Sequence, residues 1–137
     1  MAKLTVNDKD LVVQLTLGEK VWGFHGDIRV PLGVIVAVAA DPDPWLGLRG
    51  WRMAGVNFTG HTALGTRRHS GDSYDFCILH GELPAVRVDV ASGRFSRLVI
   101  SVSDGSDPEV EVARIASAAG IAPSAPVSYL GQTGTGL

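Results

Sequence analysis

The sequence predicts a mainly β (α+β) fold, an antiparallel β-barrel of about seven strands capped by one C-terminal α-helix at about 107–119. Short β-prone runs separated by turn-forming residues fill positions 4–103. A helical pattern with start and stop signals comes only after them. The 137 residues, 45% hydrophobic and 19% charged, fit one domain with a single core, which we place at 1–120.

The N-terminal part predicts a hairpin followed by a longer strand. β-prone runs at 4–6 and 11–17 flank the turn-forming tetrapeptide "NDKD". Residues 27–41 are rich in β-branched side chains and predict the next strand. Because Pro31 has no amide donor, we expect an edge position or a bend there.

Residues 41–60 predict a long connection, since they combine prolines and glycines with little alternation. Aromatic and arginine side chains together can stack a planar anion or lie at a membrane interface. A tryptophan in such a loop can instead anchor it by packing on the barrel. The candidate ligand-binding residues of this loop are Trp45, Arg49, Trp51 and Arg52.

Closely spaced runs in the middle of the chain predict a meander of strands at 62–69, 74–80, 85–90 and 96–103. A two-residue turn at Gly71-Asp72 would set Arg68 opposite Asp75 as a cross-strand ion pair. The following turn, "GELP", would set Leu79 opposite Val86.

This register separates the reactive side chains of the hairpin formed by the strands at 62–69 and 74–80. Alternation directs Cys77 into the core and the histidines outward, which disfavours a Cys–His nucleophilic pair. His69 and His80 would lie roughly 20 Å apart along the strands, too far to share a zinc ion. We therefore expect no catalytic residue and no metal site.

The outward face of the same hairpin predicts an interface. A contiguous exposed apolar patch usually marks a contact surface, so we expect a homo-oligomer. Two alternatives stay open, that residues 41–60 cover the patch or that the two faces are inverted. The candidate interface residues are Arg67, Tyr74, Phe76 and Ile78.

The helix has both ends marked. Asp107 suits the N-cap, Pro108 the first helical position and Gly120 the left-handed residue that ends a helix. Residues 121–137 are rich in Gly, Pro, Ser and Thr and predict a flexible or docked tail. The apolar stripe of the helix comprises Val112, Ile115, Ala116 and Ala119.

Two segments carry a family resemblance. "DIRVPLGVIVAVAAD" and "LVISVSDGSDPEVEVARIASA" resemble an early strand pair and the final strand and helix of bacterial pleckstrin-homology-like domains. The likeness covers roughly residues 3–119. The sequence is also similar to small uncharacterised actinobacterial proteins of this kind. It implies a binding or assembly module without enzymatic activity. The basic first hairpin of the phosphoinositide binders is missing, so lipid binding is not implied.

Composition limits the function classes. A net charge of −2 argues against a nucleic-acid binder. The start of the chain has no signal-peptide pattern and no apolar run reaches about 18 residues, so secretion and membrane spanning are not expected. The single cysteine agrees with a reducing, cytoplasmic compartment.

The sequence thus predicts a non-catalytic module that binds a protein partner or its own copy, without a cofactor. One alternative is a small split-barrel oxidoreductase, in which the loop tryptophans and Arg67 or Arg68 contact a flavin. Another is a peripheral membrane binder that uses Trp45 and Trp51.

Overall fold

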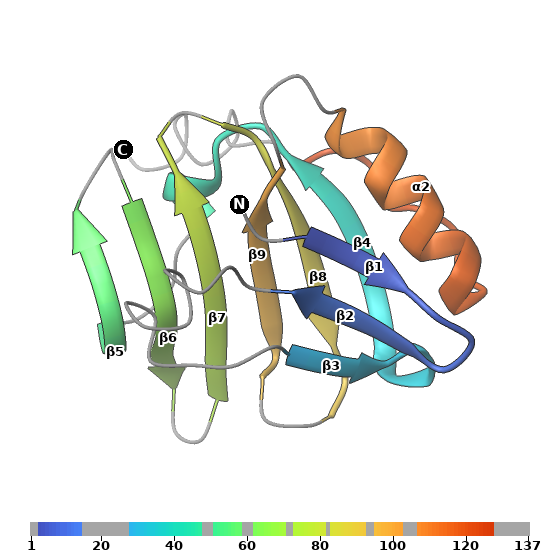
Figure 1. Ribbon diagram of the computed structural model, residues 1–137, viewed down its shortest axis with the longest axis horizontal. Helices are drawn as coiled ribbons and strands as arrows, with labels where there is room; N and C mark the ends of the chain where they lie inside the picture. Colours follow the sequence, from blue (N-terminus) through green and yellow to red (C-terminus); the bar gives the residue numbers. More distant parts are fainter. Residues whose placement is uncertain are drawn as a thin grey trace.

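The described residues form two β-sheets and one long helix (Figure 1). For β5, and for β6 apart from Gly65 and Thr66, the structure describes the backbone alone. The computed structural model describes residues 3–14, 28–47, 51–58, 62–70, 73–81, 83–92, 95–102 and 107–127.

The smaller sheet contains, in spatial order, β1 (Lys3–Val6), β2 (Asp10–Gln14) and β3 (Ile28–Pro31). The larger sheet contains, in spatial order, β4 (Ile35–Asp41), β8 (Ala85–Val90), β9 (Arg97–Ser101), β7 (Ser73–His80), β6 (Thr62–Ser70) and β5 (Trp51–Phe58). Two short 3-10 turns, η1 (Leu32–Val34) and η2 (Pro44–Gly47), flank β4, and α2 (Pro108–Ala119) is the long helix. The smaller sheet runs across one face of the larger one, and α2 lies beside β4 (Figure 1). The predicted mainly β fold with one C-terminal helix is confirmed.

The predicted N-terminal hairpin is present. Antiparallel pairing sets Leu4 opposite Val13 and Val6 opposite Leu11. The side-chain oxygen of Asn7 accepts hydrogen bonds from the backbone N–H groups of Lys9 and Asp10, both at 2.8 Å. This turn satisfies the backbone donors that the reversal of the chain would leave open.

Residues 28–41 form two strands that belong to different sheets, where the sequence predicted one strand. Strand β3 pairs with β2 in the small sheet and ends at Pro31. The chain then bends through η1 and enters the large sheet as β4. The edge position and bend expected from Pro31 are therefore both found, because a residue without an N–H cannot continue a ladder on both sides.

Part of the predicted long connection is a strand. Residues 51–58 form β5, which pairs with β6 at one edge of the large sheet. The pairing is interrupted by a register shift between Arg52 and Ala54. Gly55 and this irregularity weaken the two-residue alternation that would have revealed the strand.

The predicted meander is wrong in its strand order. Strand β9 lies between β8 and β7, antiparallel to β8 and parallel to β7. Val86 consequently pairs with Ala40 and Ile100, and Leu79 does not face it. The described strands form two sheets and no closed barrel.

Burial explains the central position of β9. Leu98 and Ile100 are fully buried on one face, and Val99 is buried on the other. A strand that is apolar on both faces is stable only where both faces are covered and both edges are paired. Two neighbours therefore suit β9 better than the edge position a meander would give it.

One main core fills the space between the two sheets and α2. The rings of Phe76 and Phe95 meet within it, with centroids 5.5 Å apart. Both sheets and the helix contribute to its fully buried side chains, among them Leu11, Val13, Val38, Val86, Val88, Leu98, Ile100 and Ile115.

Helix α2 begins and ends where the sequence predicts. The Asp107 carboxylate accepts a hydrogen bond from the N–H of Glu109 at 2.9 Å, and Gly120 has φ 73°. Of the predicted stripe, Val112, Ile115 and Ala116 are buried. On the outer side of the helix, Arg114 donates to the carbonyl of Leu4 at 2.6 Å and pairs with Glu111, which links the helix to β1.

The N-cap gives a first prediction. Replacing Asp107 by alanine removes the acceptor for the Glu109 N–H and should lower the free energy of unfolding by about 1 kcal/mol. Urea denaturation measures this change. Asp107→Asn keeps an acceptor and should stay near wild type; equal losses in the two variants would contradict a capping role.

Candidate functional site

The hairpin of β6 and β7 is shifted by one residue from the predicted register. Ser70 faces Ser73 across the turn, as a two-residue turn requires. A register shift between Arg68 and Ser70 then leaves His69 as an extra residue in β6. Asp75 therefore faces Arg67, so the predicted pairing of Arg68 with Asp75 is wrong.

The predicted exposed stripe on this hairpin is wrong as well. Phe76 and Ile78 are each 1% exposed and belong to the main core, and Tyr74 is half-buried against that core. The faces are inverted because the apolar sheet β1–β3 covers this side of the large sheet. Phe76 and Ile78 are consequently unavailable as surface contacts. The side chain of Arg67 lies outside the described residues.

The opposite face of β7 carries a second, smaller apolar cluster. Cys77, as predicted, is buried, and it packs here with Leu79, Ala85 and Val99. Trp45 packs against the cluster and donates its indole N–H to the carbonyl of Gly81 at 2.8 Å. Trp45 thus anchors the loop by packing on the sheet, which was the alternative to ligand binding that the sequence left open.

The other candidate residues of this loop stay untested predictions. Arg49 and the side chains of Trp51 and Arg52 lie outside the described residues. Beside the anchored Trp45, a hollow of about 260 Å³ is lined by the consecutive residues Pro42, Asp43, Pro44 and Trp45. A hollow formed by one short stretch offers no converging polar groups of the kind that fix a ligand.

A polar cluster lies on the same face of the large sheet as Cys77, toward the other end of β8 and β9. The Asp89 carboxylate pairs with Arg97 Nε at 2.7 Å and lies 3.9 Å from Arg87 Nε. Next to it, the Ser96 hydroxyl lies 3.2 Å from Asp75 Oδ1. Charges of opposite sign thus pair across β8 and β9, which stabilises neighbouring strands. Among the residues that the structure describes, no group of three or more His, Cys, Asp or Glu side chains could hold a metal ion.

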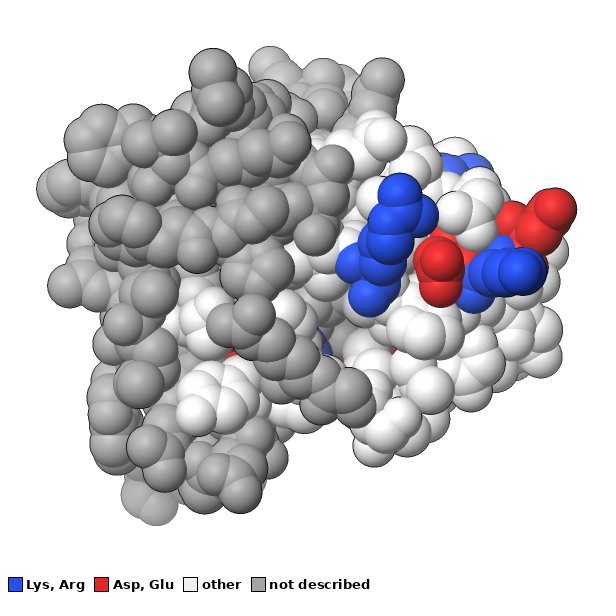
Figure 2. All heavy atoms as spheres, turned by 60° about the horizontal axis from the view of Figure 1, so that its bottom comes forward, with Lys and Arg blue, Asp and Glu red and all other residues white. Residues whose placement is uncertain are grey.

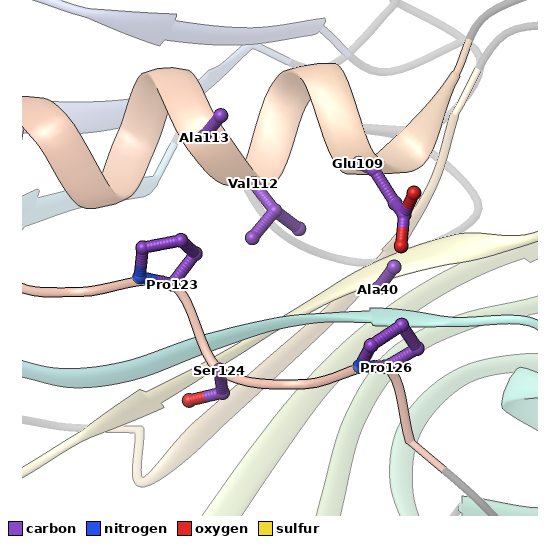
Figure 3. A pocket seen from close by; sticks show the side chains of 7 residues that line it. All are labelled: Ala40, Glu109, Val112, Ala113, Pro123, Ser124 and Pro126. Carbon is purple, nitrogen blue, oxygen red and sulfur yellow. The ribbon is translucent and has the colours of Figure 1, made fainter.

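Within the part of the chain that the structure describes, a concave site with lining from separate elements lies between α2, the outer side of β4 and residues 121–127 (Figure 3). We call residues 121–127 the docked segment and the cleft between α2 and β4, in which this segment lies, the α2–β4 groove. About 210 Å³ of the groove is unfilled. Its lining comes from separate parts of the chain and consists of Ala40, Glu109, Val112, Ala113, Pro123, Ser124 and Pro126.

Backbone hydrogen bonds hold the docked segment on β4. The N–H of Ser124 donates to the carbonyl of Val38 and the N–H of Val127 to that of Ala40, both at 2.9 Å. Residue numbers rise together on both sides, so the segment runs parallel to β4. The part of the predicted tail up to Val127 is therefore docked, and residues 128–137 lie outside the described residues.

The spacing of the prolines matches these contacts. Pro123 and Pro126 are three residues apart, and in Figure 3 their rings point toward the helix side of the groove while Ser124 points away. Three residues is the repeat of a polyproline II helix. The P-x-x-P spacing was therefore visible in the sequence as a signal for an extended, docked segment.

The face of the molecule in Figure 2 carries charges of both signs. In the view of Figure 2, basic and acidic side chains lie beside one another. This mixture agrees with the net charge of −2. No helix in the described part of the chain has the length and apolar character needed to cross a membrane.

The buried position of Phe76 gives a second prediction. Phe76→Ala should lower the free energy of unfolding by about 3–5 kcal/mol, because it leaves a cavity in the main core. Urea denaturation measures it, with Val36→Ala as the control, since Val36 is 58% exposed and should change stability by less than about 0.5 kcal/mol. Unchanged stability of Phe76→Ala together with a smaller oligomer would restore the interface hypothesis.

Comparisons with known proteins give no relative for this chain. No family model, no curated protein and no solved structure matches it.

Proposed function

We propose that the chain is a non-catalytic binding and assembly module and that its binding site is the α2–β4 groove. The observation that carries this proposal is the docked segment itself, which occupies the groove as a peptide ligand would. Ser124 and Val127 donate to consecutive outward carbonyls of β4, and Pro123 and Pro126 face the helix. The ligand class is an extended segment of a protein partner.

The mode of binding separates affinity from specificity. Hydrogen bonds to the carbonyls of Val38 and Ala40 use only the ligand backbone, as in the addition of a strand to a sheet edge. Side chains that enter the groove then distinguish one ligand from another. Prolines favour the extended form before binding and so reduce the conformational entropy lost on docking.

The docked segment also sets the apparent affinity. A partner can bind only when residues 121–127 have left the groove, so its observed Kd is the intrinsic Kd divided by the open fraction. Five consecutive residues of the segment, 122–126, are exposed, and the groove is open to solvent. Release of residues 122–126 therefore costs little buried apolar area, and the site stays accessible to a competing ligand.

Strands followed by one capped helix support a pleckstrin-homology-like module, with the likeness lying in element order and not in a meander.

Self-association is also proposed, through a surface other than the buried Phe76 and Ile78. A cytoplasmic location fits the single, buried Cys77. The flavin and membrane alternatives gain nothing from Trp45, whose indole packs on the sheet.

The proposed function predicts that the groove binds residues 121–127 when they are supplied as a separate peptide. Ser124→Pro in the full chain removes the N–H that bonds to Val38 and should release the docked segment. A labelled wild-type peptide should then bind the Ser124→Pro chain about fivefold to tenfold more tightly than it binds the unchanged chain, since one hydrogen bond contributes about 1 kcal/mol. Fluorescence anisotropy of the labelled peptide measures both affinities.

A matched control uses the neighbouring position. Ala125→Pro also adds a proline, but the Ala125 N–H is not one of the two donors to β4, so this variant should bind the peptide like wild type. A peptide that itself carries Ser124→Pro should bind less well to the opened chain. Failure of the wild-type peptide to bind the Ser124→Pro chain would refute the proposed function.

A further inference from the structure

The docked segment does not fill the α2–β4 groove. About 210 Å³ remains beside it, which is room for several water molecules. Between its ends, the segment brings only small side chains and two proline rings, from Ala122, Pro123, Ser124, Ala125 and Pro126. Unfilled space next to apolar walls forfeits dispersion contacts that a larger side chain would make.

The walls of the unfilled space select for aliphatic groups. Val112 and Ala40 are buried and Ala113 extends the same surface along α2, so the side that faces the segment is apolar. Pro123 and Pro126 direct their rings to this side (Figure 3). A ligand with larger aliphatic side chains at these two positions would bury more apolar area at about 25 cal/mol per Å².

A charge at one end of the groove is also unmatched by the docked segment. Glu109 lines the groove near Pro126 and points its carboxylate toward Ala40 (Figure 3). Among the described residues, none of the ion pairs involves Glu109. Residues 121–137 contain no lysine or arginine. A ligand with a basic residue at this end would supply the complementary charge.

We infer that the α2–β4 groove takes an extended segment of a partner protein with two large aliphatic side chains three residues apart, followed by a lysine or arginine. The inference rests on the proposed function and specifies its ligand. Residues 121–127 then act as an intramolecular competitor with undersized side chains, which a better-fitting partner displaces. The gain in buried area and the pairing with Glu109 offset the cost of that displacement.

The test compares peptides on the full, unchanged chain. The first is the native 121–127 sequence, and the second has leucine in place of both prolines and a lysine added after Val127. Anisotropy should show at least tenfold tighter binding of the leucine–lysine peptide. A third peptide, with glutamine in place of the added lysine, should bind about threefold less tightly than the second, as expected for an exposed ion pair.

Matched variants locate the effect. Ala113 and Ala118 are both exposed alanines of α2, but only Ala113 lines the groove. Ala113→Trp should fill the groove and remove the preference for the leucine peptide, and Ala118→Trp should leave it unchanged. Glu109→Gln should remove the preference for lysine over glutamine while keeping the preference for leucine, which provides a test independent of whether Ala113→Trp folds.

The outcomes separate this inference from the proposed function. If the native peptide binds the Ser124→Pro chain but the leucine–lysine peptide binds no better, the groove is a binding site without the inferred preference. If no peptide binds even the Ser124→Pro chain, both proposals fail. A tenfold preference that persists in Ala113→Trp would place the selecting surface elsewhere and overturn the inference.

Discussion

Strand β9 hydrogen-bonds to β8 along one edge and to β7 along the other, and the remaining arrangement of the chain depends on this double pairing. To admit β9, the chain must leave one strand width between β7 and β8. Strand β8 therefore lies on the far side of β9, and β4, which pairs with its other edge, becomes the outermost strand. The groove exists because β4 has this outer position beside α2. The burial of Leu98, Val99 and Ile100 is thus what leaves β4, with the proposed binding groove, at one edge of the sheet.

Local signals predicted the elements that depend on neighbouring residues alone. Asp107 and Gly120 fix the ends of α2 through contacts within a few residues, and Asn7 closes its turn in the same way. Pairing over long distances was not predictable on this basis. A strand that is apolar on both faces, such as β9, has no alternation to reveal its neighbours, and one extra residue at His69 changes which side chains of β6 and β7 share a face.

The candidate site in the structure differs from the one predicted from the sequence, because it too depends on pairing between distant parts of the chain. The segment richest in His, Cys, Arg and Asp lies in strands, where alternation sends its residues to two different faces, one of them in the main core. In the groove, by contrast, Ala40, Val112 and Pro123 come from three separate parts of the chain. The prolines at 123 and 126 were visible in the sequence, but their place on β4 depends on the sheet order.

The docked segment has a further consequence for the solubility of the protein. An open edge strand is a template on which other chains can add strands and aggregate. Ser124 and Val127 direct their amides to β4, and Pro123 and Pro126 have none, so the segment has few N–H groups left for another strand. The sheet thus ends at this side in a border that cannot readily be extended. A ligand that displaces residues 121–127 must therefore cover the edge it uncovers. Without such a ligand, the carbonyls that we propose as its acceptors are shielded from unproductive assembly.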